Sequence, residues 1–290
     1  TNKLTGVDID LKSGWNLISS PYLFPVNINI DQENFSELFY YDGSGWADTV
    51  VSKMVPWGGY AIFNYTSNDA PIKLRPLDDS EVISQSRSLN TEGWTVNVQV
   101  QGTRYSDKKN QFGVREHSNP GIDIEDCPEP PTVGQYVALY SNIEKATNDL
   151  TKLTKDFREI SEDLQVWDLT IETNIESFDG QIGTNITGLF GENELWLLDL
   201  QNRQSIQLFN GENTYHPDKI KDSKKENKFK LIYGSKVEIM NTIEFTLAQI
   251  PTEFSLKNNY PNPFNPITNI PFTVSEPAHV KISIYNVRGI

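Results

Sequence analysis

Apolar and polar residues alternate along most of this chain, which is the pattern of half-buried β-strands. The first part holds short apolar stretches that are separated by glycine and proline, at residues 14–20, 39–41, 60–63 and 72–74. Such close spacing predicts a small antiparallel β module over residues 1–78. Trp15, Trp46 and Trp57 are interpreted as a shared aromatic core of this module, with an exposed ligand platform as the alternative.

Longer alternating runs follow a polar linker. They lie at residues 94–100, 136–140, 166–171, 182–189, 194–200 and 229–233. Their number, and the lack of a clear helical period between them, predicts a β-sandwich over residues 79–250.

The last part, residues 251–290, begins with a proline-rich run and continues with alternating residues at 270–274 and 280–285. Proline cannot donate to a β ladder, so this run is not expected to be a central strand of the preceding domain. The predicted fold class is therefore all-β: a small antiparallel module, a β-sandwich and a partial C-terminal β domain.

Composition narrows the classes of function. The 290 residues carry a formal net charge of −14, which disfavours binding to nucleic acid or to anionic membrane surfaces. No apolar run approaches the ~20 residues that cross a bilayer, so no membrane span is expected. The single cysteine, Cys127, excludes a disulfide framework, and the acidic residues before it suggest an inert thiol. No hydrolase, phosphate-binding or zinc motif is present, so we expect a segment that is not an enzyme.

One acidic loop region offers the best candidate chemistry. Its oxygen-bearing side chains are those of Asp107, Asn110, Asp123, Glu125, Asp126 and Glu129, and the candidate calcium ligands among them are Asp107, Asn110, Asp123 and Asp126. Ca²⁺ takes six to eight oxygen ligands, but this spacing is not that of an EF-hand. The residues leave two further interpretations open: a solvated acidic loop whose carboxylates accept backbone N–H groups, and a carboxylate pair of the glycosidase type.

The run in the last part resembles the C-terminal sorting domain of proteins that the type IX (Por) secretion system of Bacteroidetes exports. The residues that carry this resemblance most strongly are Asn259, Tyr260, Pro261, Asn262, Pro263, Phe264, Asn265, Pro266 and Gly289. We expect residues 251–290 to be a truncated copy of that domain. Residues 1–78 and 79–250 resemble, less specifically, accessory modules that precede such domains.

The resemblance implies a non-catalytic C-terminal region of a secreted or cell-surface protein, exported through the periplasm to the outer-membrane surface or the medium. Its implied partners are the secretion machinery and an upstream cargo domain, which the resemblance suggests is a peptidase. The alternative is a binding module for a surface glycan, or for like chains that add strands to an exposed sheet edge. No cofactor other than the candidate Ca²⁺ is expected.

Overall fold

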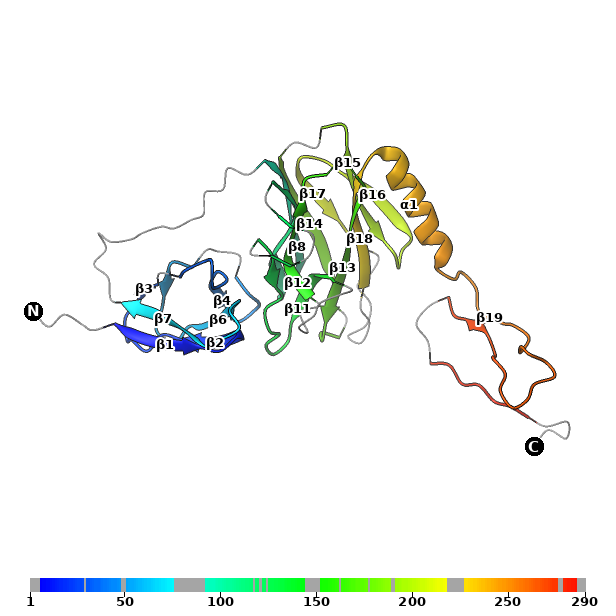
Figure 1. Cartoon of the computed structure of the whole chain (residues 1–290), viewed down its shortest axis with the longest axis horizontal. Helices are drawn as coiled ribbons and strands as arrows, with labels where there is room; N and C mark the ends of the chain where they lie inside the picture. Colours follow the sequence, from blue (N-terminus) through cyan, green and yellow to red (C-terminus); the bar gives the residue numbers. More distant parts are fainter. Residues whose placement is uncertain are drawn as a thin grey trace, which may run out of the picture. The chain divides into compact units, whose positions relative to one another are not determined.

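The computed structural model describes most of the chain, apart from its ends and several loops. The described residues are 6–28, 30–47, 51–75, 92–116, 118–119, 122–123, 125–143, 152–161, 163–176, 178–188, 191–217, 227–275 and 279–285. Strands dominate and the described residues contain one α-helix, so the predicted all-β class is confirmed (Figure 1). The chain divides into two compact units, Thr1–Ile239 and Met240–Ile290. Within the described part, no helix is long and apolar enough to cross a membrane.

The small β module consists of two short antiparallel sheets. One has the strand order β1-β7-β3-β5, with β1 Val7–Leu11, β7 Ala70–Arg75, β3 Val26–Ile28 and β5 Lys53–Met54. The other has the order β2-β6-β4, with β2 Gly14–Ser19, β6 Gly59–Asn64 and β4 Phe39–Tyr41. Side chains from both sheets form one core, which includes Leu11, Leu38, Met54, Ile62 and Leu74. The strands expected at residues 14–20, 39–41, 60–63 and 72–74 are therefore all present.

The second β region is one large sheet. Its path runs β16-β15-β18-β13-β11-β12-β9-β8-β14-β17, and β10 pairs with β12 off this path. The strands are β8 Gly93–Gly102, β9 Ser106–Arg115, β10 Cys127–Pro128, β11 Val137–Asn142, β12 Lys152–Glu159, β13 Gln165–Thr173, β14 Gly180–Gly188, β15 Glu194–Asp199, β16 Gln204–Leu208, β17 Gly211–Tyr215 and β18 Asn227–Gly234. All neighbouring pairs are antiparallel except β9 and β12, which run parallel.

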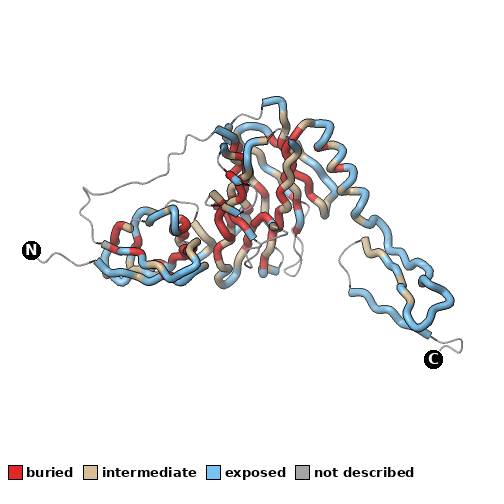
Figure 2. The backbone as a smooth tube through the Cα atoms, viewed as in Figure 1, coloured by how far each residue is buried: buried red, intermediate tan, exposed pale blue. Residues whose placement is uncertain are grey.

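This sheet curls around a single hydrophobic core, so we call it the curled sheet. Trp94 on β8 meets Trp167 on β13 and Tyr233 on β18, with ring centroids 5.7 Å and 4.9 Å apart. β8 and β18 lie well apart in the sheet order, so their side chains can touch only because the sheet folds back on itself. Figure 2 shows the buried residues gathered on these strands. In place of the two separate sheets of the predicted β-sandwich, the strands form one continuous sheet folded around its core.

One element was not expected. Helix α1, Lys236–Gln249, begins directly after β18, where the alternating pattern indicated no helix. Its start is a capping box: the Ser235 hydroxyl accepts from the backbone N–H of Glu238 at 3.4 Å, and the Ser235 N–H donates to the Glu238 carboxylate at 3.3 Å. This helix is only weakly amphipathic, so its apolar residues do not recur at a clear helical spacing that the sequence analysis could detect.

The C-terminal residues contain less strand than predicted. β19 Ser255–Leu256 pairs with β20 Phe272–Thr273, which lies inside the expected strand at 270–274. The second expected strand, residues 280–285, is described and is not a strand. Alternation alone does not make a strand, because the backbone groups need a partner, and the described residues provide none there.

Candidate functional site

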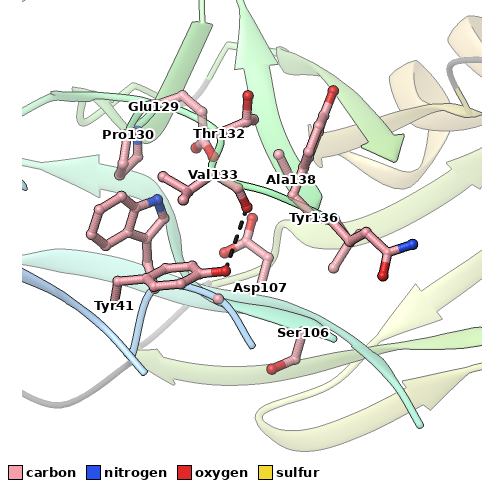
Figure 3. A pocket seen from close by; sticks show the side chains of 13 residues that line it. Tyr41, Ser106, Asp107, Glu129, Pro130, Thr132, Val133, Tyr136 and Ala138 are labelled. Carbon is pink, nitrogen blue, oxygen red and sulfur yellow. Dashed lines mark hydrogen bonds between the residues drawn. The ribbon is translucent and has the colours of Figure 1, made fainter. Parts of the chain in front are cut away.

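The small module meets the curled sheet through three side chains that donate hydrogen bonds to backbone carbonyls. Tyr65 Oη lies 3.0 Å from the carbonyl oxygen of Asp126, and Trp46 Nε1 lies 3.2 Å from that of Pro131. Tyr41 Oη lies 3.4 Å from the carbonyl oxygen of Val133 (Figure 3). We call these contacts, together with the ion pairs and apolar contacts described next, the module interface.

A buried carboxylate carries two ion pairs across the module interface. Glu37 of the module lies with Oε1 2.5 Å from Lys155 Nζ and Oε2 3.2 Å from Lys109 Nζ, and the two lysines belong to β12 and β9. Burial alone would raise the pKa of Glu37, but the two ammonium groups hold it below its ordinary value. Glu37 is therefore ionised, and its single negative charge is shared by two ammonium groups, which together exceed it by one positive charge.

Apolar contacts complete the module interface. Phe39 and Ala61 of the module pack with Cys127 of β10, and all three are nearly inaccessible to solvent. The Lys109 ammonium lies 4.7 Å from the centroid of the Phe39 ring, a favourable cation–π distance. Burial raises the pKa of the Cys127 thiol to about 12, so it stays protonated and unreactive, as expected.

Beside the module interface lies a cavity of about 20 Å³, room for roughly one water molecule. Tyr41 and Trp46 line it from the module, and Asp107 and Glu129 bring carboxyl groups from the curled sheet (Figure 3). Burial raises the pKa of Asp107 to about 6, and burial together with the nearby Asp107 raises that of Glu129 well above its ordinary value. Two carboxyl groups this close in a buried place favour protonation of at least one of them.

The four predicted calcium ligands fall into two places. Asp107 and Asn110 lie on β9, whereas Asp123 and Asp126 lie in the loop before β10. Among the residues that the structure describes, no group of three or more histidine, cysteine or acidic side chains is placed to hold a metal ion. The calcium site remains an untested prediction.

The oxygens of these residues bond to the protein itself. The carboxylate of Asp126 accepts the backbone N–H of Phe157 at 2.8 Å and that of Asp123 at 2.9 Å. The Asp107 carboxylate accepts the backbone N–H of Leu139 at 2.6 Å. Burial nevertheless raises the pKa of Asp126 to about 8. The contacts of Asp126 agree with the alternative in which the loop carboxylates accept backbone N–H groups. The solvated part of that alternative is wrong for Asp126, which is buried.

The side-chain oxygens of Asp123 and Asn110 also accept hydrogen bonds from the protein. Asp123 accepts backbone N–H groups from Glu125 at 2.8 Å and from Asn119 at 2.7 Å. The side-chain oxygen of Asn110 accepts from the Thr154 hydroxyl at 2.9 Å.

The residues of the predicted sorting motif, from Asn259 to Pro266, form a turn closed by a two-bond bridge. Tyr260 and Asn269 exchange N–H···O=C bonds of 2.9 Å in both directions, and the Thr268 hydroxyl donates to the carbonyl of Pro261 at 2.9 Å. The Tyr260 and Phe264 side chains are 77% and 56% exposed. Gly289, the last residue of the predicted motif, lies outside the described residues.

The shared aromatic core predicted for the module is partly wrong. Trp15 and Trp46 pack against Phe39 with ring centroids 5.6 Å and 6.4 Å apart, as expected of core residues. Trp57 is 89% exposed, with a φ of 64° that non-glycine residues seldom adopt. It follows Pro56 in a tight turn in which the Gly58 N–H donates to the Val55 carbonyl, so its side chain projects away from the module core.

Sequence reasoning missed Glu37, Lys109, Lys155 and Tyr65 as interface residues. They are scattered along the chain and match no motif, so only the packing of the module on the curled sheet brings them together. Comparison with family models, with curated proteins and with solved structures found no match to this chain.

Proposed function

We propose that this chain is the non-catalytic C-terminal region of an exported surface protein. Residues 251–290 would carry the type IX sorting signal, and the module with the curled sheet would act as a rigid spacer behind a cargo domain. The protein would pass through the periplasm and end at the cell surface or in the medium.

The observation that carries this proposal is that the motif residues are folded while their aromatic side chains are exposed. The Asn259–Pro266 run is folded into a hydrogen-bonded turn, yet its two aromatic rings are exposed rather than used in packing. Exposed large aromatics in an ordered turn suit recognition by another protein, because such rings bury much area at low entropic cost when a partner covers them.

The module interface supports the spacer role. Glu37 with its two lysines, and the three side-chain bonds to the segment 126–133, join two β regions that the sequence separates by a polar linker. A spacer needs this kind of rigidity, because a flexible joint would leave the small module free to move relative to the curled sheet.

The test replaces the two exposed rings in the native host. The double variant Tyr260→Ala/Phe264→Ala should accumulate in the periplasm, as should a deletion of residues 251–290, when fractions are probed by immunoblotting. Phe245→Ala on α1 is the matched control, since that ring is 68% exposed but lies outside the motif, and this variant should reach the surface. Normal surface delivery of the deletion variant would contradict the proposed sorting role.

A further inference from the structure

One end of the curled sheet carries an open hollow of about 420 Å³. It lies where β15 begins and β16 ends, because the register places Leu195 opposite Leu208 and so brings residues 191–194 beside residues 209–210. Leu195 and Leu208, which are both buried, are among the residues that line it. Its volume falls within the ~300–1,000 Å³ that is usual for small-ligand pockets.

An aromatic ring stands exposed at the rim of this hollow. Phe209 is 60% exposed, and its backbone is held by Asn213, whose side-chain oxygen accepts the Phe209 N–H at 3.1 Å and whose amide donates to the Phe209 carbonyl at 2.8 Å. The turn between them has Gly211 at a φ of 90°. The ring is thus carried on a fixed backbone, which reduces the entropy that binding would cost.

The turn itself does not require an aromatic residue at this position. The module contains a second turn of the same construction, in which the Asn16 side chain bonds the N–H and the carbonyl of Lys12, with Gly14 at a φ of 88°. Lys12 there occupies the place of Phe209. The fold of this turn therefore does not explain the exposed aromatic ring of Phe209.

The polar lining consists of groups that suit hydroxyls. Asn193, Gln207 and Asn210 contribute amides, each of which both donates and accepts hydrogen bonds. Glu194 contributes a carboxylate, which is oriented by a 2.8 Å hydrogen bond from Trp196 Nε1 to Oε2. Neighbouring amide and carboxylate groups can match the alternating donors and acceptors of adjacent sugar hydroxyls.

We propose that this hollow binds a neutral sugar ring of a polysaccharide or glycan. The apolar C–H face of the sugar would lie on Phe209, and its hydroxyls would bond to the amides and to Glu194. Among the described residues that line it there is a carboxylate and no basic side chain, so a phosphate, sulfate or uronate would meet negative charge from them. This proposed sugar site does not depend on the proposed sorting role, and the two proposals are tested by separate experiments.

The test is calorimetric titration of the full chain with neutral hexasaccharides of glucose, xylose, mannose and N-acetylglucosamine, and with an oligogalacturonate as the anionic counterpart. At least one neutral sugar should bind, and the anionic one should not. Phe209→Ala should weaken binding about tenfold, the effect of losing one stacked ring, and Phe209→Tyr should restore it.

Trp57→Ala provides the matched control, because it removes another exposed ring of the same unit. It should leave the affinity unchanged, and thermal melting should show that all variants are folded. Binding of none of the neutral sugars would overturn the proposal. Loss of binding in Trp57→Ala but not in Phe209→Ala would also overturn it, because that result would move the site to the module.

Discussion

Phe39 and Phe264 are two phenylalanines in different regions of the molecule, and they differ in how far they are buried. Phe39, in the small module, is fully buried and meets the rings of Trp15 and Trp46 edge to face. Phe264, in the sorting-motif turn, is 56% exposed although it too lies in a folded segment. The two rings differ because residues of the curled sheet, Cys127 and Lys109, cover Phe39, whereas Phe264 remains largely exposed.

The largest effect expected from this comparison is on stability. Phe39→Ala should lower the free energy of unfolding of the Thr1–Ile239 unit by about 3–5 kcal/mol, since it opens a cavity at a fully buried site. Phe264→Ala should leave that free energy nearly unchanged. Urea unfolding followed by tryptophan fluorescence measures both variants, and equal losses would contradict the assigned contrast.

Buried and exposed ion pairs sharpen the comparison. Glu37→Gln should cost about 3 kcal/mol, because it leaves the ammonium groups of Lys109 and Lys155 largely buried without their counter-charge. Asp69→Asn breaks the exposed pair with Lys12 and should change the unfolding free energy little. A double-mutant cycle of Glu37→Gln with Lys155→Met isolates the coupling, and a zero coupling energy would rule out the ion pair as a contributor.

A smaller effect, of about 1–3 kcal/mol, should depend on pH. Burial raises the pKa of Asp107 from its ordinary 3.8 to about 6, so the folded state retains a proton that the unfolded state releases. The stabilising contribution is complete below pH 3.8 and is lost as the pH rises through 6. Asp107→Asn mimics the protonated form, so it should match the wild type near pH 4 and exceed its stability at pH 8, as chemical denaturation at several pH values would show.

Asp42, a carboxylate whose pKa is shifted in the opposite direction, serves as the control for that measurement. Burial would raise the pKa of Asp42, but the hydroxyl of Ser44 and the backbone N–H groups of Ser44 and Gly45 lower it below its ordinary value. Its contribution is therefore present above the ordinary pKa and is lost on acidification. Asp42→Asn should destabilise the protein at pH 8, and the same pH trend in both variants would contradict the assignment for Asp107.

The strands of the curled sheet that could be predicted are those whose inward face is apolar. β8 alternates buried and partly exposed residues without interruption, so period two was sufficient to find it. β9 was missed because its first half buries Asp107, Lys109 and Asn110, which lie near the small module and its ion pair. A polar strand that is buried by a second module carries no apolar alternation, and the sequence alone does not show that the module will cover it.

The sequence predicted some of the candidate functional residues and missed others. The proline-rich run was visible as a contiguous motif, whereas the module interface is assembled from residues that only tertiary packing brings together. The residues around Phe209 gave no motif either, because a sugar site of this kind is defined by a register and a turn. Helix α1 had a readable signal, the Ser235–Glu238 capping box, which the strand pattern before it obscured.

The three bonds across the module interface have one property that bears on how this protein changes over generations. Tyr41, Trp46 and Tyr65 donate from side chains, whereas Asp126, Pro131 and Val133 accept through main-chain oxygens. Every amino acid supplies a main-chain oxygen, so substitutions at Pro131 and Val133 can preserve these bonds as long as the backbone path is kept. The donors have no such freedom. Among homologues, Tyr41, Trp46 and Tyr65 should therefore be conserved, whereas the residues at positions 131 and 133 should vary more.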